Sequence, residues 1–235
     1  MVKTIDILGI EVNNSSVRDM MHMVEEYMDE PAMNTIETIT ASMLLDCQNN
    51  PFMQEVLNGL DLPVIGDVEI LSAAGIDATS KRQEINSHEF FHEFMKYMVR
   101  SHKSIFMLGE DQQELDELTT YVNEEYGKVK IVGSHVVVAD REDLDGAINE
   151  LNGTTPDVII SLLDSPFQEE FLQKERLKLN ASLWFGIGKN YARKNRFGPI
   201  GRFARHLIYR GKLMRSISEY DEEVGQVHEK PSKTD

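Results

Sequence analysis

The chain has 235 residues, 41% of them hydrophobic and 27% charged, which is the composition of a soluble globular protein with one large or two small domains. It has no apolar run of membrane-spanning length, its N-terminus lacks a signal peptide's apolar segment, and its lone cysteine, Cys47, can form no internal disulfide. We therefore expect a cytoplasmic protein.

The formal net charge of −16 is segregated along the chain. Residues 1–175 carry −23, residues 176–215 carry +11 and residues 216–235 carry −4. Such a basic block is typical of a contact with phosphates. Because the acidic body would repel a nucleic-acid backbone, we expect no nucleic-acid partner.

The first half of the chain alternates between strand and helix patterns. A strand is predicted over 4–10, and a helix begins at its cap, Ser16, and runs to about Met28. Further predicted elements are a strand over 34–41, helices over 42–46 and 51–59, a strand over 62–65, a helix over 68–74, and a helix over 90–99 capped by Ser87.

The second half repeats the alternation. The predicted elements are a strand over 104–108, a helix over 112–126, a strand over 129–132, a helix over 140–151, a strand over 158–163, a helix from Ser165 and a strand over 183–187. This order predicts an α/β fold, a Rossmann-like mostly parallel sheet with helices on both faces. We expect one α/β domain over 1–188, with lobes of about 1–100 and 101–188, a basic helical appendage over 189–218 and a disordered tail over 219–235.

The turn after the strand over 158–163 has the composition of a capping box. Ser165 can accept from free backbone N–H groups, Pro166 suits the first helical position, and Gln168 can reach back. Because such a helix N-terminus lies at the carboxyl end of a strand, an anionic group could also dock there. The pattern leaves both roles open.

His88, Glu89 and His92 fit the H-E-x-x-H zinc template. The same helix carries an apolar stripe that a core-facing helix needs, and no third ligand is evident. We therefore expect packing, and no metal site.

The segment 157–170, DVIISLLDSPFQEE, resembles the strand and loop of the WecG/TagA/CpsF glycosyltransferases. Pro166, Gln168 and Glu169 match the family's pattern, whereas Asp164 and Phe167 replace its glycine and its basic residue. The resemblance implies transfer of an N-acetylhexosamine, such as N-acetylmannosamine, from a UDP-sugar to a polyprenyl-diphosphate-linked or other cell-envelope acceptor. It implies no cofactor, because the UDP-sugar is the donor substrate.

The resemblance also suggests roles for residues at the ends of the strands. Thr40 and Ser42 resemble a T-x-N element that, with Ser165 and Gln168, would position the sugar or nucleotide. Asp67 would be the general base that takes the proton from the acceptor hydroxyl. Ser42 and Asp67 could equally cap the helices that follow them.

Two further residues would face the diphosphate. Arg82 lies near an arginine of the family that would neutralise the leaving group, although a solvated loop charge is an equal interpretation. Gly109 resembles part of an L-G-G loop, but Glu110 replaces the second glycine and its charge would oppose a diphosphate.

Residues 189–218 contain an amphipathic pattern in which Arg202 and Arg205 interrupt apolar residues. Such a helix can bind an anionic membrane surface, or it can pack on the acidic body of its own chain. We expect a peripheral contact with the membrane, and the resemblance implies that the arginines steady the diphosphate. The altered family positions also fit a degenerate relative that binds a nucleotide-sugar or a protein partner without turnover. The sequence leaves open whether the protein is a homo-oligomer.

Overall fold

The computed structural model describes residues 3–137, 144–189, 209–220 and 222. These residues form an eight-stranded sheet in the order β1-β2-β4-β3-β8-β7-β5-β6. Strands β1 and β2 are antiparallel, and every other neighbouring pair is parallel. The predicted Rossmann-like, mostly parallel α/β fold is confirmed.

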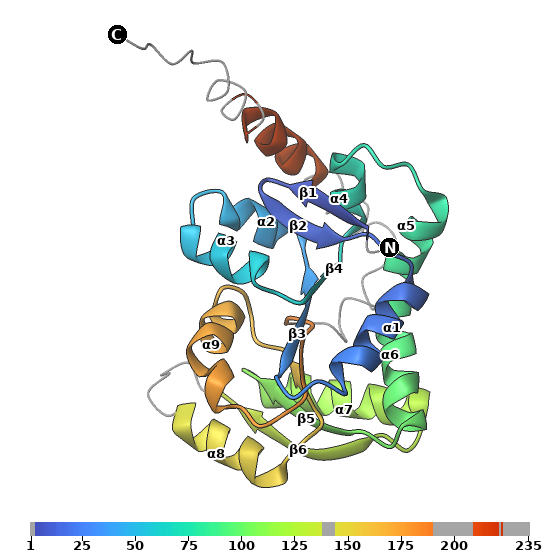
Figure 1. The fold of residues 1–235 in the computed structure, drawn as a ribbon, viewed down its shortest axis with the longest axis vertical. Coiled ribbons are helices and arrows are strands. Elements are labelled where there is room, and N and C mark those ends of the chain that lie inside the picture. Colours follow the sequence, from blue (N-terminus) through green and yellow to red (C-terminus); the bar gives the residue numbers. More distant parts are fainter. Residues whose placement is uncertain (1–2, 138–143, 190–208, 221, 223–235) are drawn as a thin grey trace.

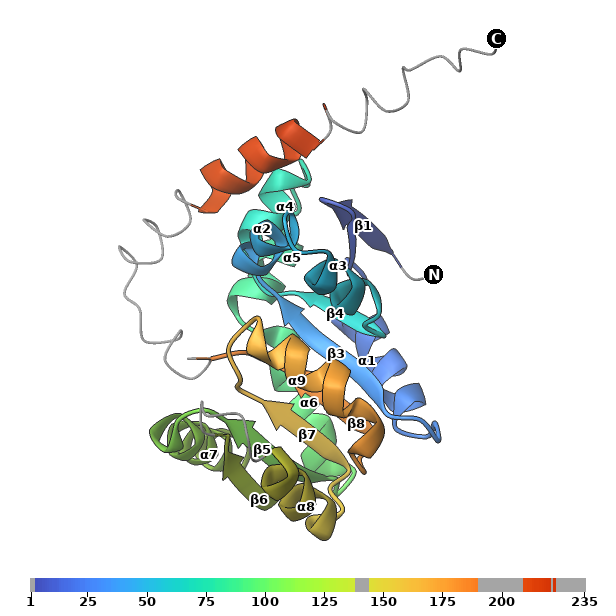
Figure 2. The same cartoon turned by 90° about the vertical axis from the view of Figure 1, so that its left-hand side faces the viewer.

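The strands are short, and the central ones are buried on both faces of the sheet. Figure 2 shows them stepping from β1 at one end to β6 at the other. Their bounds are β1 Thr4–Ile7, β2 Ile10–Asn13, β3 Asn34–Ile39, β4 Leu62–Ile65, β5 Ser104–Gly109, β6 Lys130–Val136, β7 Val158–Ser161 and β8 Leu183–Gly186.

Helices cover both faces of the sheet. One face carries α2 (Ala41–Cys47), α3 (Pro51–Asn58), α8 (Leu144–Thr154) and α9 (Phe167–Glu175), and the other carries α1 (Val17–Tyr27), α6 (Glu89–Arg100) and α7 (Gln112–Tyr126) (Figure 1). Helices α4 (Val68–Ala73) and α5 (Thr79–Asn86) connect β4 to α6, and the short 3₁₀ helix η1 (Arg176–Lys178) follows α9.

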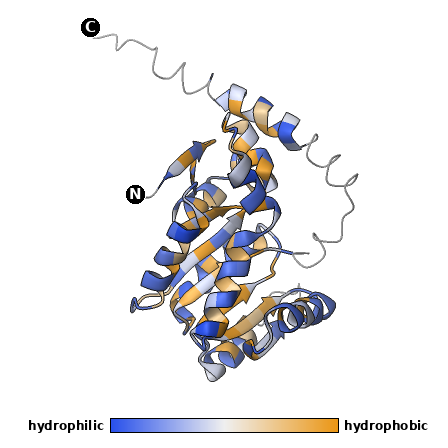
Figure 3. Ribbon diagram, turned by 90° about the vertical axis from the view of Figure 1, so that its right-hand side faces the viewer, coloured by the Kyte–Doolittle hydropathy of each residue, from blue (hydrophilic) through white to orange (hydrophobic). Residues whose placement is uncertain are grey.

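Two hydrophobic cores result, one on each face of the sheet. In the first, Phe171 of α9 stacks on Trp184 of β8 with ring centroids 5.7 Å apart. In the second, Phe94 of α6 meets Phe185 of β8 edge to face at 4.8 Å. Neighbouring residues of β8 thus point into opposite cores, and Figure 3 shows apolar strands beneath helices whose outer sides are hydrophilic.

The N-terminal strand prediction was wrong in its extent. The chain reverses at Leu8 and Gly9, where φ is 59° and 79°, so residues 4–13 form a hairpin of β1 and β2. The apolar residues continue through the turn, which hid it from the hydropathy pattern. Gly9 makes the reversal inexpensive because glycine adopts positive φ readily.

Helix α5 was also missed, since none of its residues is buried and it has no apolar stripe. The next boundary shifts with it. Ser87 ends α5, and α6 begins after His88, whose backbone has a left-handed φ of 53°. The prediction that Ser87 caps α6 was therefore wrong.

A last described helix, residues 209–220, packs on the body of the protein. Leu213 is fully buried, and Gln48 of α2 donates from Nε2 to the carbonyl of Ser216 at 3.3 Å. Tyr220 belongs to this helix, so the prediction of a disordered tail is wrong for residues 219 and 220, and most of the remaining predicted tail lies outside the described residues. Among the helices in the described ranges, none combines the length and hydropathy that a membrane crossing needs.

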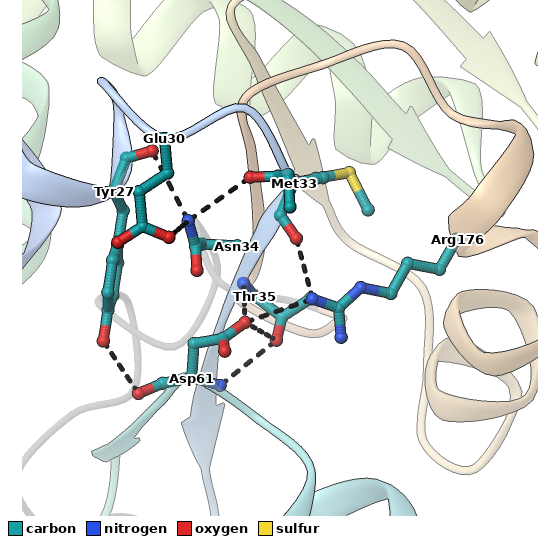
Figure 4. A network of polar contacts seen from close by, with 8 residues as sticks. Tyr27, Glu30, Met33, Asn34, Thr35, Asp61 and Arg176 are labelled. Atoms are coloured by element: carbon teal, nitrogen blue, oxygen red, sulfur yellow. Dashed lines mark hydrogen bonds and ion pairs between the residues drawn. The ribbon is translucent and has the colours of Figure 1, made fainter.

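Two similar hydrogen-bond networks, each centred on an aspartate, connect neighbouring strands at their amino ends. Asp61, just before β4, accepts from the backbone N–H and the hydroxyl of Thr35 in β3, both at 2.8 Å (Figure 4). Arg176 adds a contact to the same carboxylate at 3.3 Å. Asp157, before β7, accepts likewise from the N–H and hydroxyl of Ser104 in β5, at 2.7 and 2.6 Å. The polar groups at the amino ends of these strands are thus hydrogen-bonded to one another.

Candidate active site

The carboxyl ends of β3 and β4 bring three of the predicted site residues together. Thr40 follows β3, and its hydroxyl lies 3.0 Å from that of Ser42 and accepts from the N–H of Met43 at 3.3 Å. Thr40 is therefore the cap of α2. Ser42 is the second residue of that helix, so the alternative that Ser42 caps it is wrong.

Asp67 follows β4 and is joined to the same place. Its Oδ2 accepts a hydrogen bond from the N–H of Ala41, the first residue of α2, at 3.0 Å. Asp67 occupies the N-cap position of α4 but makes no side-chain cap there. Its carboxylate thus meets the positive end of α2, beside Thr40 and Ser42, in an arrangement that stabilises a negative charge.

A cavity of about 40 Å³ lies at the end of β4, and Gly66, the residue before Asp67, forms part of its wall; Thr40, Ser42 and Asp67 are not among its lining residues. Apolar side chains from α1, α6, β4 and β8 line it, together with Thr38, Gly66, Lys81, Glu84 and His88. Gly66 is required at its wall, because a Cβ there would lie 2.5 Å from Cγ2 of Thr38 and 2.9 Å from the carbonyl oxygen of Ile39.

The two neighbouring cations of α5 point in different directions. Lys81 lines the cavity, where its Nζ pairs with Glu84 at 3.2 Å and donates to the carbonyl of Ser15. Arg82 instead donates to the hydroxyl of Ser72 at 3.1 Å and lies 3.8 Å from Asp77. The cation beside the cavity is Lys81, the neighbour of the arginine that the sequence suggested.

The carboxyl ends of β5 and β7 are acidic. Gly109 is the last residue of β5, and a Cβ added there would lie 3.0 Å from Cδ2 of Leu115. The next residue, Glu110, accepts a hydrogen bond from the N–H of Asp164 at 2.9 Å. Asp111 caps α7 by accepting from the N–H of Glu114 at 3.1 Å. Glu110 therefore ties the loop after β5 to the loop after β7.

The predicted capping box at Ser165 is wrong. Helix α9 begins after Pro166, which follows a cis peptide bond and makes no side-chain cap. Gln168 points into the core, where its Nε2 donates to the carboxylate of Glu37 in β3. Gln168, which the sequence predicted at an accessible helix N-terminus, is only 2% exposed.

Glu37 and Glu169 are buried acids; sequence reasoning noted Glu169 only as part of the family's pattern and missed Glu37 altogether. Burial raises the pKa of Glu37 well above its ordinary value, and the nearby charge of Glu169 raises it further. Burial also raises the pKa of Glu169, whereas its neighbours Glu37 and Ser165 act to lower it. The signal in the sequence is the glutamate itself, since an acid in a strand covered on both faces is unusual.

The H-E-x-x-H residues do not converge. His88 lies at the cavity rim before α6, and Nδ1 of His92 is hydrogen-bonded to the hydroxyl of Tyr126 in α7. Phe90, Phe91 and Phe94 of the same stretch are buried, as the apolar stripe predicted. Across the part of the chain that the structure describes, no three His, Cys, Asp or Glu side chains are grouped to hold a metal ion.

The site residues therefore fall into two groups. Thr40, Ser42 and Asp67 share one point of the edge, whereas Gln168 lies in the core below it and Arg82 turns toward α4. Arg202 and Arg205 lie outside the described residues.

Comparison with known proteins identifies a family and several relatives that this chain resembles. The model of the glycosyl transferase WecG/TagA/CpsF family matches residues 5–192. An N-acetylglucosaminyldiphosphoundecaprenol N-acetyl-beta-D-mannosaminyltransferase of Staphylococcus aureus is 19% identical over 186 residues, which cover 78% of this chain and 72% of that protein. The enzyme of the same name from Bacillus subtilis is 21% identical over 192 residues, covering 81% and 74%.

Proposed function

The chain belongs to the WecG/TagA/CpsF family of glycosyltransferases, and we propose that it moves an N-acetylhexosamine from a UDP-sugar to a polyprenyl-diphosphate-linked acceptor. One observation carries the proposal. The hydrogen bond between Ala41 and Asp67 holds a carboxylate against the start of α2, where Thr40 and Ser42 carry hydroxyls, at the carboxyl edge of the sheet. The names of the relatives support the choice of sugar and acceptor.

In this proposal Asp67 is the general base. Its carboxylate takes the proton of the acceptor hydroxyl while that oxygen forms a bond to the anomeric carbon. The bond from the anomeric carbon to the diphosphate breaks, UDP leaves with the electron pair, and the anomeric configuration inverts. A well-placed base of this kind contributes about 10²-fold to 10⁴-fold in rate.

The negative charge of the leaving diphosphate needs cations. Lys81 is our first candidate, because its side chain lines the cavity that Gly66 also lines. A hydrogen bond from its ammonium to the phosphate would become stronger as negative charge develops on the leaving group. Arg82, Arg202 and Arg205 remain proposals for the same task. Thr40, Ser42, Ser165, Gly109 and Gln168 remain proposals for holding sugar or nucleotide.

The acceptor's lipid chain requires access to a membrane. We propose that residues 189–218 provide it through contact with an anionic surface. The observation in favour is composition, a net +11 over residues 176–215. The described end of this segment already packs part of its apolar side on the body, so the membrane would meet the side that remains exposed.

A catalytically degenerate relative is the second candidate, and the acidic pair Glu110 and Asp164 favours it. These residues occupy the ends of β5 and β7, where their charges would oppose a diphosphate. Such a protein would bind a nucleotide-sugar or a protein partner without turnover.

The test is a UDP-release assay with a panel of UDP-sugars and a synthetic lipid-linked N-acetylglucosamine diphosphate, combined with thermal shifts. We expect UDP to stabilise the protein, and Asp67→Asn to lower turnover by about 10²-fold or more while UDP still stabilises the variant. Asp116→Asn, exposed on α7, is the matched control. Stabilisation by UDP without turnover would favour the degenerate relative, and the absence of any response to uridine nucleotides would overturn both.

A further inference from the structure

Three polar side chains meet inside the core, where β3 passes under α9. Glu37 lies in the middle of β3, between β4 and β8, and its exposed fraction is 0%. Glu169 is also 0% exposed and Gln168 is 2% exposed. Buried polar groups of this kind are normally paired, so their partners indicate what they do.

The partners are few. Gln168 donates from Nε2 to Oε1 of Glu37, whereas Oε2 of Glu37, Oε1 of Gln168 and both carboxylate oxygens of Glu169 make no hydrogen bond to any described residue. In the described part of the chain, no lysine, arginine or histidine forms an ion pair with Glu37 or Glu169. A carboxylate needs such a partner to remain ionised in an apolar core.

Around the pair, the residues that the structure describes supply no positive charge that an ion pair would need. Cys47 faces the pair from α2 as a buried thiol, and Asp164 lies near Glu169 in the loop before α9. Two carboxylates that interact in a low-dielectric core cannot both ionise cheaply, and a proton between them removes most of the cost. A carboxylic acid facing a carboxylate also gains a strong, charge-assisted hydrogen bond.

We propose that Glu37 and Glu169 share one proton and that this acid pair is a positioning device, holding Gln168 and the start of α9 against β3. Gln168 lies beneath Gly186 of β8, where a Cβ would come within 2.6 Å of its Nε2. Glu37, Gln168 and Glu169 therefore connect strands β3 and β8 to the first turn of α9.

This connection matters for the site because the two halves of the sheet meet there. Thr40 and Asp67 follow β3 and β4, whereas Asp164 and Ser165 follow β7. A substrate that spans the edge needs these loops at a fixed separation, and misplacement by about 1 Å can cost about 10²-fold in rate. This positioning role rests on the proposed transferase function, but the shared proton does not.

The direct test is infrared spectroscopy of the full-length protein at neutral pH, where a protonated carboxyl gives a carbonyl band distinct from that of a carboxylate. We expect one such band in the native protein and in the control Glu124→Gln, which is exposed on α7. Glu37→Gln and Glu169→Gln should each remove or shift the band. A native protein without the band, or a band that neither variant changes, would overturn the proposal.

The positioning role is tested by comparing two substitutions of Glu37. Glutamine keeps an oxygen that can accept from Gln168, whereas leucine does not. We expect Glu37→Leu to speed amide hydrogen exchange at residues 168–170 by about 10-fold or more, with Glu37→Gln close to the native rate. We also expect Glu37→Leu to lower the rate of sugar transfer, with a larger effect on kcat than on KM.

Equal exchange in the three proteins would exclude positioning by Glu37. If the leucine variant does not fold, exchange in Glu37→Gln and in Gln168→Ala decides the matter, because only the second should loosen the start of α9. A native protein without transferase activity would leave the band and the exchange rates readable, so failure of the proposed function is distinguishable from failure of this inference.

Discussion

The backbone N–H of Ala41 donates a hydrogen bond to Oδ2 of Asp67 across 3.0 Å and so joins the loop after β3 to the loop after β4. Asp67 comes to this position because Gly66 lets the chain pass close to β3, where its own N–H donates to the carbonyl of Ile39 at 2.8 Å. The carboxylate is thereby fixed against the N-terminus of α2. One contact serves both the stability of the edge and the placement of the proposed base.

Substitution of Asp67 should separate these two roles. Asparagine retains an oxygen that can accept from Ala41, so we expect Asp67→Asn to keep the native unfolding free energy while losing turnover. Asp67→Ala should lower the unfolding free energy by about 0.5–2 kcal/mol as well, the range for the loss of a helix cap. Urea unfolding measures the difference, and equal stability of the two variants would show that the Ala41 contact contributes nothing.

Lys81 and Arg82 form a matched pair for the phosphate contact. We expect Lys81→Met to weaken binding of UDP-sugars by about 10-fold to 10²-fold, the usual effect of losing one charged hydrogen bond. Arg82→Met should change it little, because that guanidinium points to Ser72 and Asp77. Isothermal titration calorimetry checks both, and a larger loss in Arg82→Met would restore the arginine that the sequence suggested.

Gly186 should tolerate no side chain. An added Cβ would lie 2.6 Å from Nε2 of Gln168, so Gly186→Ala must displace the buried amide, and we expect a loss of about 1–3 kcal/mol in unfolding free energy. Gly153 is the control, because a Cβ there meets nothing within 4 Å and the residue lies in α8. Gly153→Ala should stabilise the protein by about 0.4–1 kcal/mol.

The helix 209–220 allows its packing to be separated from a membrane contact. Leu213 is fully buried, so Leu213→Ala should cost about 2–5 kcal/mol. Met214, 47% exposed, should change stability by less than about 0.5 kcal/mol when replaced by Asp. Flotation with anionic vesicles then measures membrane binding, and Met214→Asp should weaken it. Equal flotation of the native protein and Met214→Asp would argue against this face as the contact.

The parallel sheet could be predicted from the sequence because its central strands are apolar runs and its helices carry apolar stripes. The stripe of Phe90, Phe91 and Phe94 identified α6, and the unit from β7 to β8 was confirmed with its parallel pairing. Helix α5 escaped because none of its side chains is buried. Periodicity detects burial, and an element that buries nothing gives no signal.

The site was harder to predict because its geometry depends on contacts between distant segments. Ser165 and Gln168 have capping-box spacing, yet Gln168 finds its partner in Glu37, far away in sequence. Asp67 stands at the start of α4, but its carboxylate accepts from the first N–H of a different helix, α2. Local spacing identified residues at the carboxyl edge, whereas their partners follow from the strand order β4-β3-β8.

The acid pair predicts how stability changes with pH. The pKa of Glu37 is raised in the folded protein above its ordinary value of 4.5, so the folded state holds its proton to higher pH than the unfolded chain. This contribution to the unfolding free energy is therefore full below about pH 4.5 and is lost as the pH rises toward the folded pKa.

Glu37→Gln removes one of the two acids, so its unfolding free energy should fall less steeply with rising pH than that of the native protein. Despite burial, the pKa of Asp157 is lowered by its hydrogen bonds from Ser104 and Lys103. Its contribution to the unfolding free energy is therefore lost as the pH falls below about its ordinary pKa of 3.8, and it does not affect the slope at higher pH. Urea unfolding from about pH 4 to about pH 8 measures the slopes, with Glu124→Gln as control. Parallel curves for the native protein and Glu37→Gln would mean that Glu37 binds no additional proton in the folded state.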